Sequence, residues 1–119
     1  MAKRKTAADE LHKTIIEAIL DKKGKDPISL DLRKLKDAPA EFFIIAHGDS
    51  TTQVRAIFDN VVEETTKAGF KPFRVESSKG SEWMIADYGY IFVHLFYREK
   101  RDFYALEELW SDAVETKYE

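Results

Sequence analysis

Residues 80–96 read GSEWMIADYGYIFVHLF. Two apolar, β-prone runs at 83–86 and 90–96 are separated by residues 87–89, and the glycine in this short link suits a tight turn. The pattern predicts an antiparallel hairpin. This hairpin supplies two neighbouring strands of a sheet to which the rest of the chain must add.

The segment before the hairpin predicts a strand, a helix and a second strand. Residues 41–46 (EFFIIA) form a continuous β-prone run, which is typical of a strand covered on both faces. Residues 73–75 predict a short strand, and Gly69 is expected to end the helix between the two strands. The apolar residues of that helix recur at helical spacing: Val54, Ile57, Phe58, Val61 and Val62. A right-handed parallel crossover is the preferred connection in such a unit.

The first 32 residues predict a helix followed by a strand. Thr6 and Asp9 fit a capping box, and Gly24 follows two lysines as a stop signal. Between these signals the apolar positions repeat at helical spacing: Ala8, Leu11, Ile15, Ala18 and Ile19. Residues 28–32 alternate between apolar and polar, which indicates a half-exposed strand.

The segment after the hairpin predicts a final amphipathic helix that continues to the end of the chain. Helical spacing is shared by the apolar residues Leu106, Leu109, Trp110, Ala113 and Val114. Core packing is expected for most of the set Leu106, Leu109 and Trp110. The predicted order is αββαβββα, an α/β fold in which a mixed sheet of about five strands is flanked by helices. We expect a single domain over residues 1–119, with residues 1–5 flexible.

The composition excludes several classes of site. The chain has 119 residues and no cysteine, so disulfides, thiolate metal sites and a cysteine nucleophile are excluded. No apolar run approaches the roughly 20 residues needed to span a bilayer, and no apolar signal core follows the basic residues 1–5. We therefore expect a cytoplasmic protein with no membrane partner.

The net charge of −3 is unevenly distributed along the chain. Residues 1–40 carry ten Lys/Arg against seven Asp/Glu, a charge of +3, whereas residues 41–119 carry nine against fifteen, a charge of −6. An acidic body lacks the dense basic face that nucleic-acid binding requires. It favours a basic protein as the partner, and direct sequence-specific binding of nucleic acid is not expected.

Residues 48–50 (GDS) resemble a catalytic or phosphate-binding turn. A nucleophile elbow requires a second glycine where Thr52 stands, and a Walker loop requires Gly-Lys-Ser/Thr. A nucleotidyltransferase requires paired carboxylates on the next strand to hold two Mg²⁺ ions, and that strand offers only Arg74 and Glu76. Asp49 or Ser50 is therefore interpreted as a helix cap. We expect no enzymatic activity, no metal and no cofactor.

Large aromatic residues and carboxylates lie together around the hairpin. Trp83 and Asp87 share one face of their strand because side chains alternate along a strand, and Glu82 and Tyr88 flank them. Since Trp and Tyr often anchor protein–protein contacts, these four residues are candidates for a contact surface. No metal-ligand spacing is present among His12, His47 and His94. His94 lies in an apolar strand and is expected to be a hydrogen-bonded core residue.

These motifs resemble a known family. From about residue 11 to residue 113 the chain is similar to the bacterial ribosomal silencing factors of the Iojap-related family. The resemblance is carried by LDL (30–32), EFFIIAHGDS (41–50), QV (53–54), AI (56–57), EWMIADYG (82–89), VHLF (93–96) and RDFYALEELW (101–110). The family usually has aspartate, threonine and asparagine at positions 41, 47 and 49, and its fold is similar to a nucleotidyltransferase core.

The resemblance implies a function without chemistry. Family members bind the fourteenth protein of the large ribosomal subunit (uL14) and sterically block the joining of the small subunit, which represses translation under nutrient limitation or in stationary phase. The implied contact residues are Glu82, Trp83, Asp87 and Tyr88, with His94, Tyr104, Glu107 and Trp110 as further candidates. Related organelle proteins assist large-subunit assembly, so an assembly factor is the alternative, and a nucleotidyltransferase-like enzyme is a less favoured one. The family is often dimeric, and a homodimer is expected on that ground.

Overall fold

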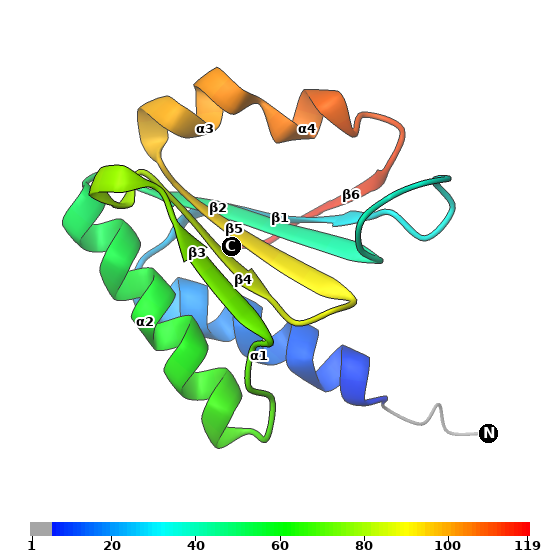
Figure 1. Ribbon diagram of the computed structural model, residues 1–119, viewed down its shortest axis with the longest axis horizontal. Helices are drawn as coiled ribbons and strands as arrows, with labels where there is room; N and C mark the ends of the chain where they lie inside the picture. Colours follow the sequence, from blue (N-terminus) through cyan, green and yellow to red (C-terminus); the bar gives the residue numbers. More distant parts are fainter. Residues whose placement is uncertain (1–5) are drawn as a thin grey trace.

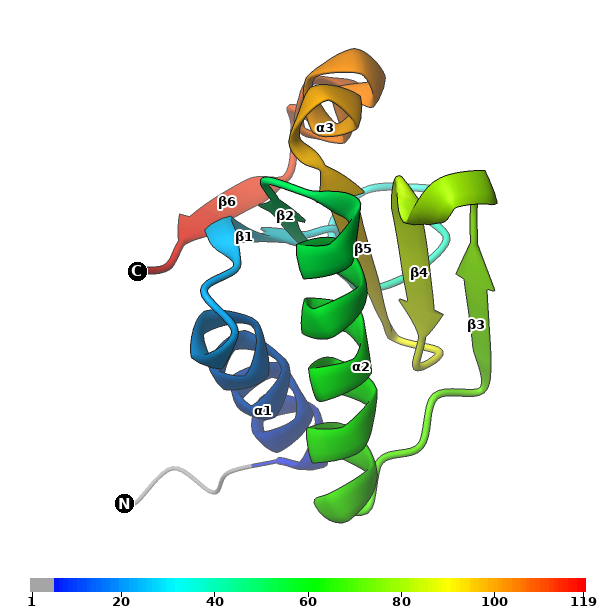
Figure 2. The same cartoon turned by 90° about the vertical axis from the view of Figure 1, so that its left-hand side faces the viewer.

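A mixed β-sheet lies between two helical layers in the computed structural model (Figure 1). The structure describes residues 6–119, so the predicted flexibility of residues 1–5 concerns residues outside this range. The long helices α1 (Ala7–Asp21) and α2 (Thr51–Lys67) cover one face of the sheet, and the short helices α3 (Arg98–Tyr104) and α4 (Leu106–Leu109) lie on the other (Figures 1 and 2). The predicted α/β class is confirmed.

The sheet has six strands in the order β3-β4-β5-β2-β1-β6. They are β1 (Lys25–Asp31), β2 (Phe42–Gly48), β3 (Arg74–Ser77), β4 (Trp83–Asp87), β5 (Ile91–Tyr97) and β6 (Val114–Lys117), with the 3₁₀-helix η1 (Lys79–Ser81) between β3 and β4. Only β2 and β5 pair in parallel, and the other neighbours are antiparallel. The predicted hairpin is confirmed as β4 and β5. The predicted strand at 73–75 is β3, which runs parallel to β2 but is separated from it by two strands.

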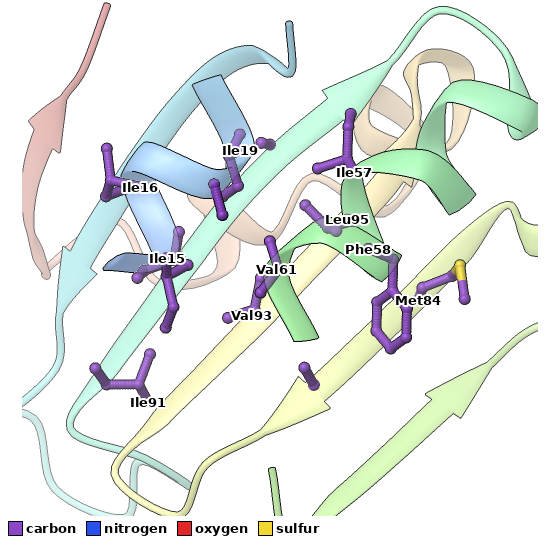
Figure 3. Close-up of a cluster of buried hydrophobic side chains, with 14 of the residues drawn as sticks. Ile15, Ile16, Ile19, Ile57, Phe58, Val61, Met84, Ile91, Val93 and Leu95 are labelled. Atoms are coloured by element: carbon purple, nitrogen blue, oxygen red, sulfur yellow. The ribbon is translucent and has the colours of Figure 1, made fainter. Parts of the chain in front are cut away.

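The two long helices begin at the predicted caps. The Thr6 side chain accepts a hydrogen bond from the Asp9 N–H at 3.1 Å and forms a complete capping box. The Ser50 hydroxyl accepts the Gln53 N–H at 3.1 Å at the start of α2. Both helices pack their apolar stripes on the same side of the sheet, over β2, β4 and β5 (Figure 3). The buried side chains drawn there include Ile15, Ile19, Ile57, Val61, Met84, Val93 and Leu95.

The predicted C-terminal helix is wrong beyond Leu109. Ala105 adopts a left-handed conformation (φ 45°) that separates α3 from α4, and the chain then enters β6, which pairs antiparallel with β1. The outer edge of β1 offers unpaired backbone groups, and the β-branched Val114 and Thr116 suit a strand, so pairing there outweighs the helical spacing. Leu109 is consequently 71% exposed and does not pack in the core.

β1 is also more deeply buried than a half-exposed strand. Ser29 was expected on the polar face, but only 5% of its surface is exposed. Tyr118, which follows β6, brings its hydroxyl to 3.3 Å from the Ser29 hydroxyl. The sixth strand therefore accounts for this difference as well, because it carries the C-terminal residues over β1.

The cap of α2 gives a direct test of the turn at residues 48–50. Replacing Ser50 with alanine removes the acceptor for the Gln53 N–H, and we expect the free energy of unfolding to fall by about 1 kcal/mol. Asp49→Ala removes only a surface ion pair with Arg98 at 3.6 Å, and its effect should stay below about 0.5 kcal/mol. Urea unfolding measures both values. A larger loss for Asp49→Ala would show that the cap is misassigned.

A candidate protein-binding surface

The face of the sheet opposite α1 and α2 is rich in aromatic side chains, and we call it the aromatic face. Along β4 the side chains at 84 and 86 are buried, whereas those at 83, 85 and 87 on the other face are partly exposed. The predicted common face of Trp83 and Asp87 is therefore present. The aromatic face comprises Trp83, Ile85 and Asp87 of β4, Phe92, His94 and Phe96 of β5, and Phe43 of β2.

Trp83 is held in place by three neighbours. Its ring stacks on Phe96 with centroids 5.0 Å apart, and Tyr104 of α3 packs against it at 4.5 Å. Its indole N–H donates a hydrogen bond to His94 Nδ1 at 3.2 Å. A partly exposed Trp with a fixed ring loses little conformational entropy on binding, which suits an anchor residue.

The aromatic contacts continue from Trp83 across the sheet. His94 meets Phe43 edge-on at 4.5 Å, and Phe43 lies against Trp110 at 5.9 Å and stacks with Phe92 at 6.0 Å. Four of the predicted contact residues thus join one connected aromatic cluster on this face: Trp83, His94, Tyr104 and, at its far end, Trp110.

His94 is a neutral residue within this cluster. Burial lowers the pKa of His94 to about 4, because a charged imidazolium would lose its hydration. Since the Trp83 N–H is a donor only, Nδ1 must be the acceptor and Nε2 carries the proton. Within residues 6–119 the buried Nε2 has no hydrogen-bond partner. His94 is therefore a largely buried residue that orients the Trp83 indole through this hydrogen bond.

Asp87 lies at the end of β4 with a rigid carboxylate. Oδ1 accepts the Gly89 N–H at 2.7 Å in the hairpin turn, and Oδ2 lies 3.7 Å from the Arg74 guanidinium on β3. Arg74 is 62% exposed and also lies near Glu76, so the pair is weak and Arg74 is free to turn aside. The Asp87 side chain is 17% exposed, so part of its carboxylate reaches the surface beside Arg74.

Two other predicted residues flank the hairpin but differ in placement. Tyr88 points into the core, where it is 3% exposed and its hydroxyl lies 2.7 Å from the Thr65 hydroxyl of α2. It offers no side-chain surface on the aromatic face. Glu82 is partly exposed beside Trp83, and its carbonyl accepts the Tyr97 N–H at 2.9 Å.

Glu107 is turned inward as well. Its Oε2 accepts a hydrogen bond from Arg101 Nε at 3.0 Å, and its buried Oε1 has no hydrogen-bond partner within residues 6–119. The Glu107 carboxylate therefore serves the packing of α4 on α3. Trp110, at the end of α4, is partly exposed next to Phe43.

The structure adds two exposed apolar residues to this surface: Phe103, which the sequence did not single out, and Leu109, which was expected in the core. Phe103 is 75% exposed and packs edge-on against Tyr104 at 5.1 Å, so it extends the aromatic face outward along α3. Leu109 on α4 is exposed because the helix ends there. Their exposure depends on the break at Ala105, for which the sequence carries no glycine signal.

The described residues also bear on the excluded classes of site. Residues 6–119 contain no group of three or more His, Asp or Glu side chains placed to hold a metal ion. No helix in the same range is both long enough and apolar enough to cross a bilayer. A hollow of about 510 Å³ lies between α1 and β6 beside His12 and Tyr118, away from the aromatic face.

Comparison with known proteins identifies the family. The model of the family described as "Ribosomal silencing factor during starvation" (RsfS) matches residues 5–119. The chain belongs to this family. A ribosomal silencing factor of Chromobacterium violaceum is 39% identical over 102 residues, which cover 86% of this chain and 83% of that protein. A crystal structure of a protein from the same organism has a TM-score of 0.83 at 37% identity and covers 89% of this chain and 88% of that chain.

A more distant relative carries a different name. The mouse protein named "Mitochondrial assembly of ribosomal large subunit protein 1" is 30% identical over 74 residues, which cover 60% of this chain and 32% of the mouse protein. The resemblance of the sequence to the silencing-factor family is confirmed, and so is its link to translation regulation and the ribosome. The aromatic face is thus a surface on a silencing-factor fold.

The pKa of His94 predicts a loss of stability in acid. Below about pH 6.5 the unfolded chain binds a proton on this histidine that the folded chain accepts only near pH 4. The free energy of unfolding should therefore fall with pH in this window, by about 2 kcal/mol between pH 7 and pH 5. In His94→Gln this part of the loss of stability should vanish. Burial also lowers the pKa values of His12 and His47, so their contributions to the loss should remain in the variant. Urea unfolding at both pH values measures it, and equal losses in the two proteins would contradict the assignment.

The burial of Tyr88 predicts a stability effect for a single oxygen atom. Tyr88→Phe removes the hydroxyl that contacts Thr65, and we expect a loss of about 1 kcal/mol in the free energy of unfolding. The Thr65 hydroxyl keeps its bond to the Val61 carbonyl at 2.8 Å, which limits the loss. Tyr90→Phe, in the same turn, is the matched control and should change stability by less than about 0.5 kcal/mol. Equal stability of Tyr88→Phe and the wild type would refute the buried bond.

Proposed function

We propose that this protein binds the large ribosomal subunit through uL14 and blocks the joining of the small subunit by occupying its binding face. The observation that supports this proposal most directly is the anchored Trp83 on the same face of β4 as the Asp87 carboxylate, on the incompletely covered side of a silencing-factor fold. Repression of translation under nutrient limitation or in stationary phase follows as the biological role.

The exposed parts of the aromatic face support a protein partner. Trp83, Ile85 and Phe92 are partly exposed on the face of the sheet that carries α3 and α4 (Figure 1). Tyr104 and Phe103 continue the apolar area, with 44% and 75% of their surfaces exposed. A contiguous exposed apolar area on a monomer is commonly an interaction site.

The charge of the surface supports a basic partner. Asp87 and Glu82 lie at the two ends of β4 on either side of Trp83. Residues 41–119 as a whole carry a charge of −6, which favours the approach of a basic protein and disfavours the phosphate backbone of RNA. An aromatic centre with charged residues at its rim is the usual arrangement of a specific protein interface.

The proposed mechanism is steric exclusion and requires no reaction. The protein measures 46 × 33 × 27 Å, so a bound copy is a large obstacle between two subunits that must come into contact. The residues of the turn at 48–50 have structural roles, since Ser50 caps α2 and Asp49 pairs with Arg98. We therefore propose a regulator without enzymatic activity, in preference to a nucleotidyltransferase.

A role in large-subunit assembly is the second candidate, and the name of the mouse relative favours it. Both roles use the same binding surface, so mutation of that surface does not separate them. A strain that lacks the protein does: large-subunit precursors that accumulate during fast growth would support assembly, and excess translation during starvation would support silencing. We expect the second result.

Two substitutions test the binding surface. Trp83→Ala removes the aromatic anchor, and we expect the dissociation constant for the large subunit to rise at least roughly 30-fold. Asp87→Lys sets like charges against a basic partner and should weaken binding at least as much. Cosedimentation of the purified protein with large subunits measures affinity, and sucrose gradients with both subunits measure joining.

Matched controls separate binding from folding. Asp87→Asn keeps an oxygen for the Gly89 N–H but removes the charge, so it should also weaken binding while stability is retained. Asp59→Lys reverses a charge on exposed α2, in the opposite layer, and should leave affinity within about twofold. Folded Trp83→Ala and Asp87→Asn proteins that bind like the wild type would rule out this surface. Wild-type protein that leaves joining unchanged would rule out the function.

A further inference from the structure

Arg101 is a buried arginine at the centre of a hydrogen-bond network. It lies in α3 and is 7% exposed. Its NH1 contacts the carbonyls of Lys25 and Asp26 at 3.3 and 2.9 Å and His47 Nδ1 at 2.9 Å, and its Nε donates to Glu107 at 3.0 Å. A buried charge requires such a set of acceptors, because desolvation without them is strongly unfavourable.

These contacts join the neighbouring helices α3 and α4 to β1 and β2, which lie more than 50 residues earlier in the sequence. Lys25 and Asp26 belong to β1 at the point where its register with β2 shifts, and His47 is near the end of β2. Glu107 belongs to α4, so Arg101 ties both short helices to the start of β1 and the end of β2. We refer to Arg101, His47 and Glu107 as the clamp.

The clamp determines where Tyr104 lies. Tyr104 follows Arg101 by one helical turn and ends α3, after which Ala105 reverses the chain in a left-handed conformation with its N–H on the Arg101 carbonyl at 2.9 Å. Tyr104 then packs on Trp83 at 4.5 Å. Because α3 has only seven residues and Arg101 is its one buried residue, tertiary contacts must hold it in place.

His47 accepts this hydrogen bond only in its neutral form. An arginine nitrogen is a donor only, so Nδ1 must be unprotonated. Burial and the adjacent Arg101 charge lower the pKa of His47, and the carboxylates of Asp26, Asp49 and Asp102 oppose this effect. Lys25 is its cross-strand neighbour on β1. A proton on Nδ1 would replace the bond to Arg101 with repulsion between two cations.

We infer that Arg101 is a positioning residue for the binding surface: seated on neutral His47, it holds α3 and α4 on the sheet so that Tyr104 supports Trp83, and acid releases this segment. The consequence for ribosome binding rests on the proposed function. The attachment of α3 and α4 to the sheet is a property of the free protein and is tested without the ribosome.

Arg101→Lys tests the clamp, because lysine keeps the charge but cannot reach the separate acceptors together. We expect amide hydrogen exchange in residues 98–110 to accelerate about tenfold or more, with residues 51–67 of α2 changed less than about threefold. The NMR signal of the Trp83 indole N–H, assigned with the Trp83→Phe variant, should shift towards the position of an indole that lacks the contact with Tyr104. Arg98→Lys is the matched control on the same helix, since Arg98 is 60% exposed, and should match the wild type in both measurements.

The pH profile separates positioning from a general effect on stability. Opening of the segment frees His47 to bind a proton. The equilibrium constant for opening of residues 98–110, obtained from amide exchange after correction for the intrinsic rate, should therefore rise by up to about tenfold for each pH unit below pH 6.5. His47→Gln keeps an acceptor oxygen but does not titrate, and its profile should be flat. A profile for His47→Gln that matches the wild type would overturn the inference.

The remaining outcomes are also decisive. Unchanged exchange in Arg101→Lys, or an equal acceleration in α2, would overturn the clamp. Faster exchange with an unchanged Trp83 signal would overturn the positioning of the surface. If the wild type binds large subunits, Arg101→Lys should bind about tenfold or more weakly and Arg98→Lys within about twofold. If the wild type does not bind them, the proposed function fails, and exchange and the indole signal still decide the clamp.

Discussion

The parallel pairing of β2 with β5 is the interaction on which the rest of the structure depends. The two strands pair over seven residues, and every residue of β2 from Phe43 to Gly48 is buried. Such a pair presents side chains to both faces, so each face must be covered. The helices α1 and α2 cover one face, where Val93 and Leu95 are buried (Figure 3), and α3 and α4 cover the other face only in part.

The unequal covering of the two faces produces the candidate binding surface. β4 is added beside β5, beyond the reach of α4, and its alternate side chains Trp83 and Asp87 therefore stand at the border between core and solvent. A hydrogen bond to His94 and a ring contact with Tyr104 fix the indole of Trp83. A rigid ring with one free side is suited to a partner protein, whereas a fully buried one would only stabilise the fold.

The parts of the fold that local sequence determines could be predicted. The caps at Thr6 and Ser50, the hairpin and the strand–helix–strand unit depend on residues close in the chain. The C-terminal strand could not, because β6 forms by pairing with β1, more than 80 residues earlier. The roles of Tyr88 and His47 depend likewise on distant partners, Thr65 and Arg101. The common face of Trp83 and Asp87 could be predicted from the alternation of side chains along a strand. The exposure of Phe103 could not, because it depends on the break at Ala105.

The orientation of the protein on the large ribosomal subunit tests the central claim most directly. A cryo-EM structure of the complex at a resolution that shows side chains would reveal which face of the sheet meets the ribosome. The account predicts that Trp83 is buried against uL14, with Asp87 near a basic side chain and with α1 and α2 facing away from that protein. A complex in which α1 and α2 form the contact and Trp83 stays exposed to solvent would contradict it.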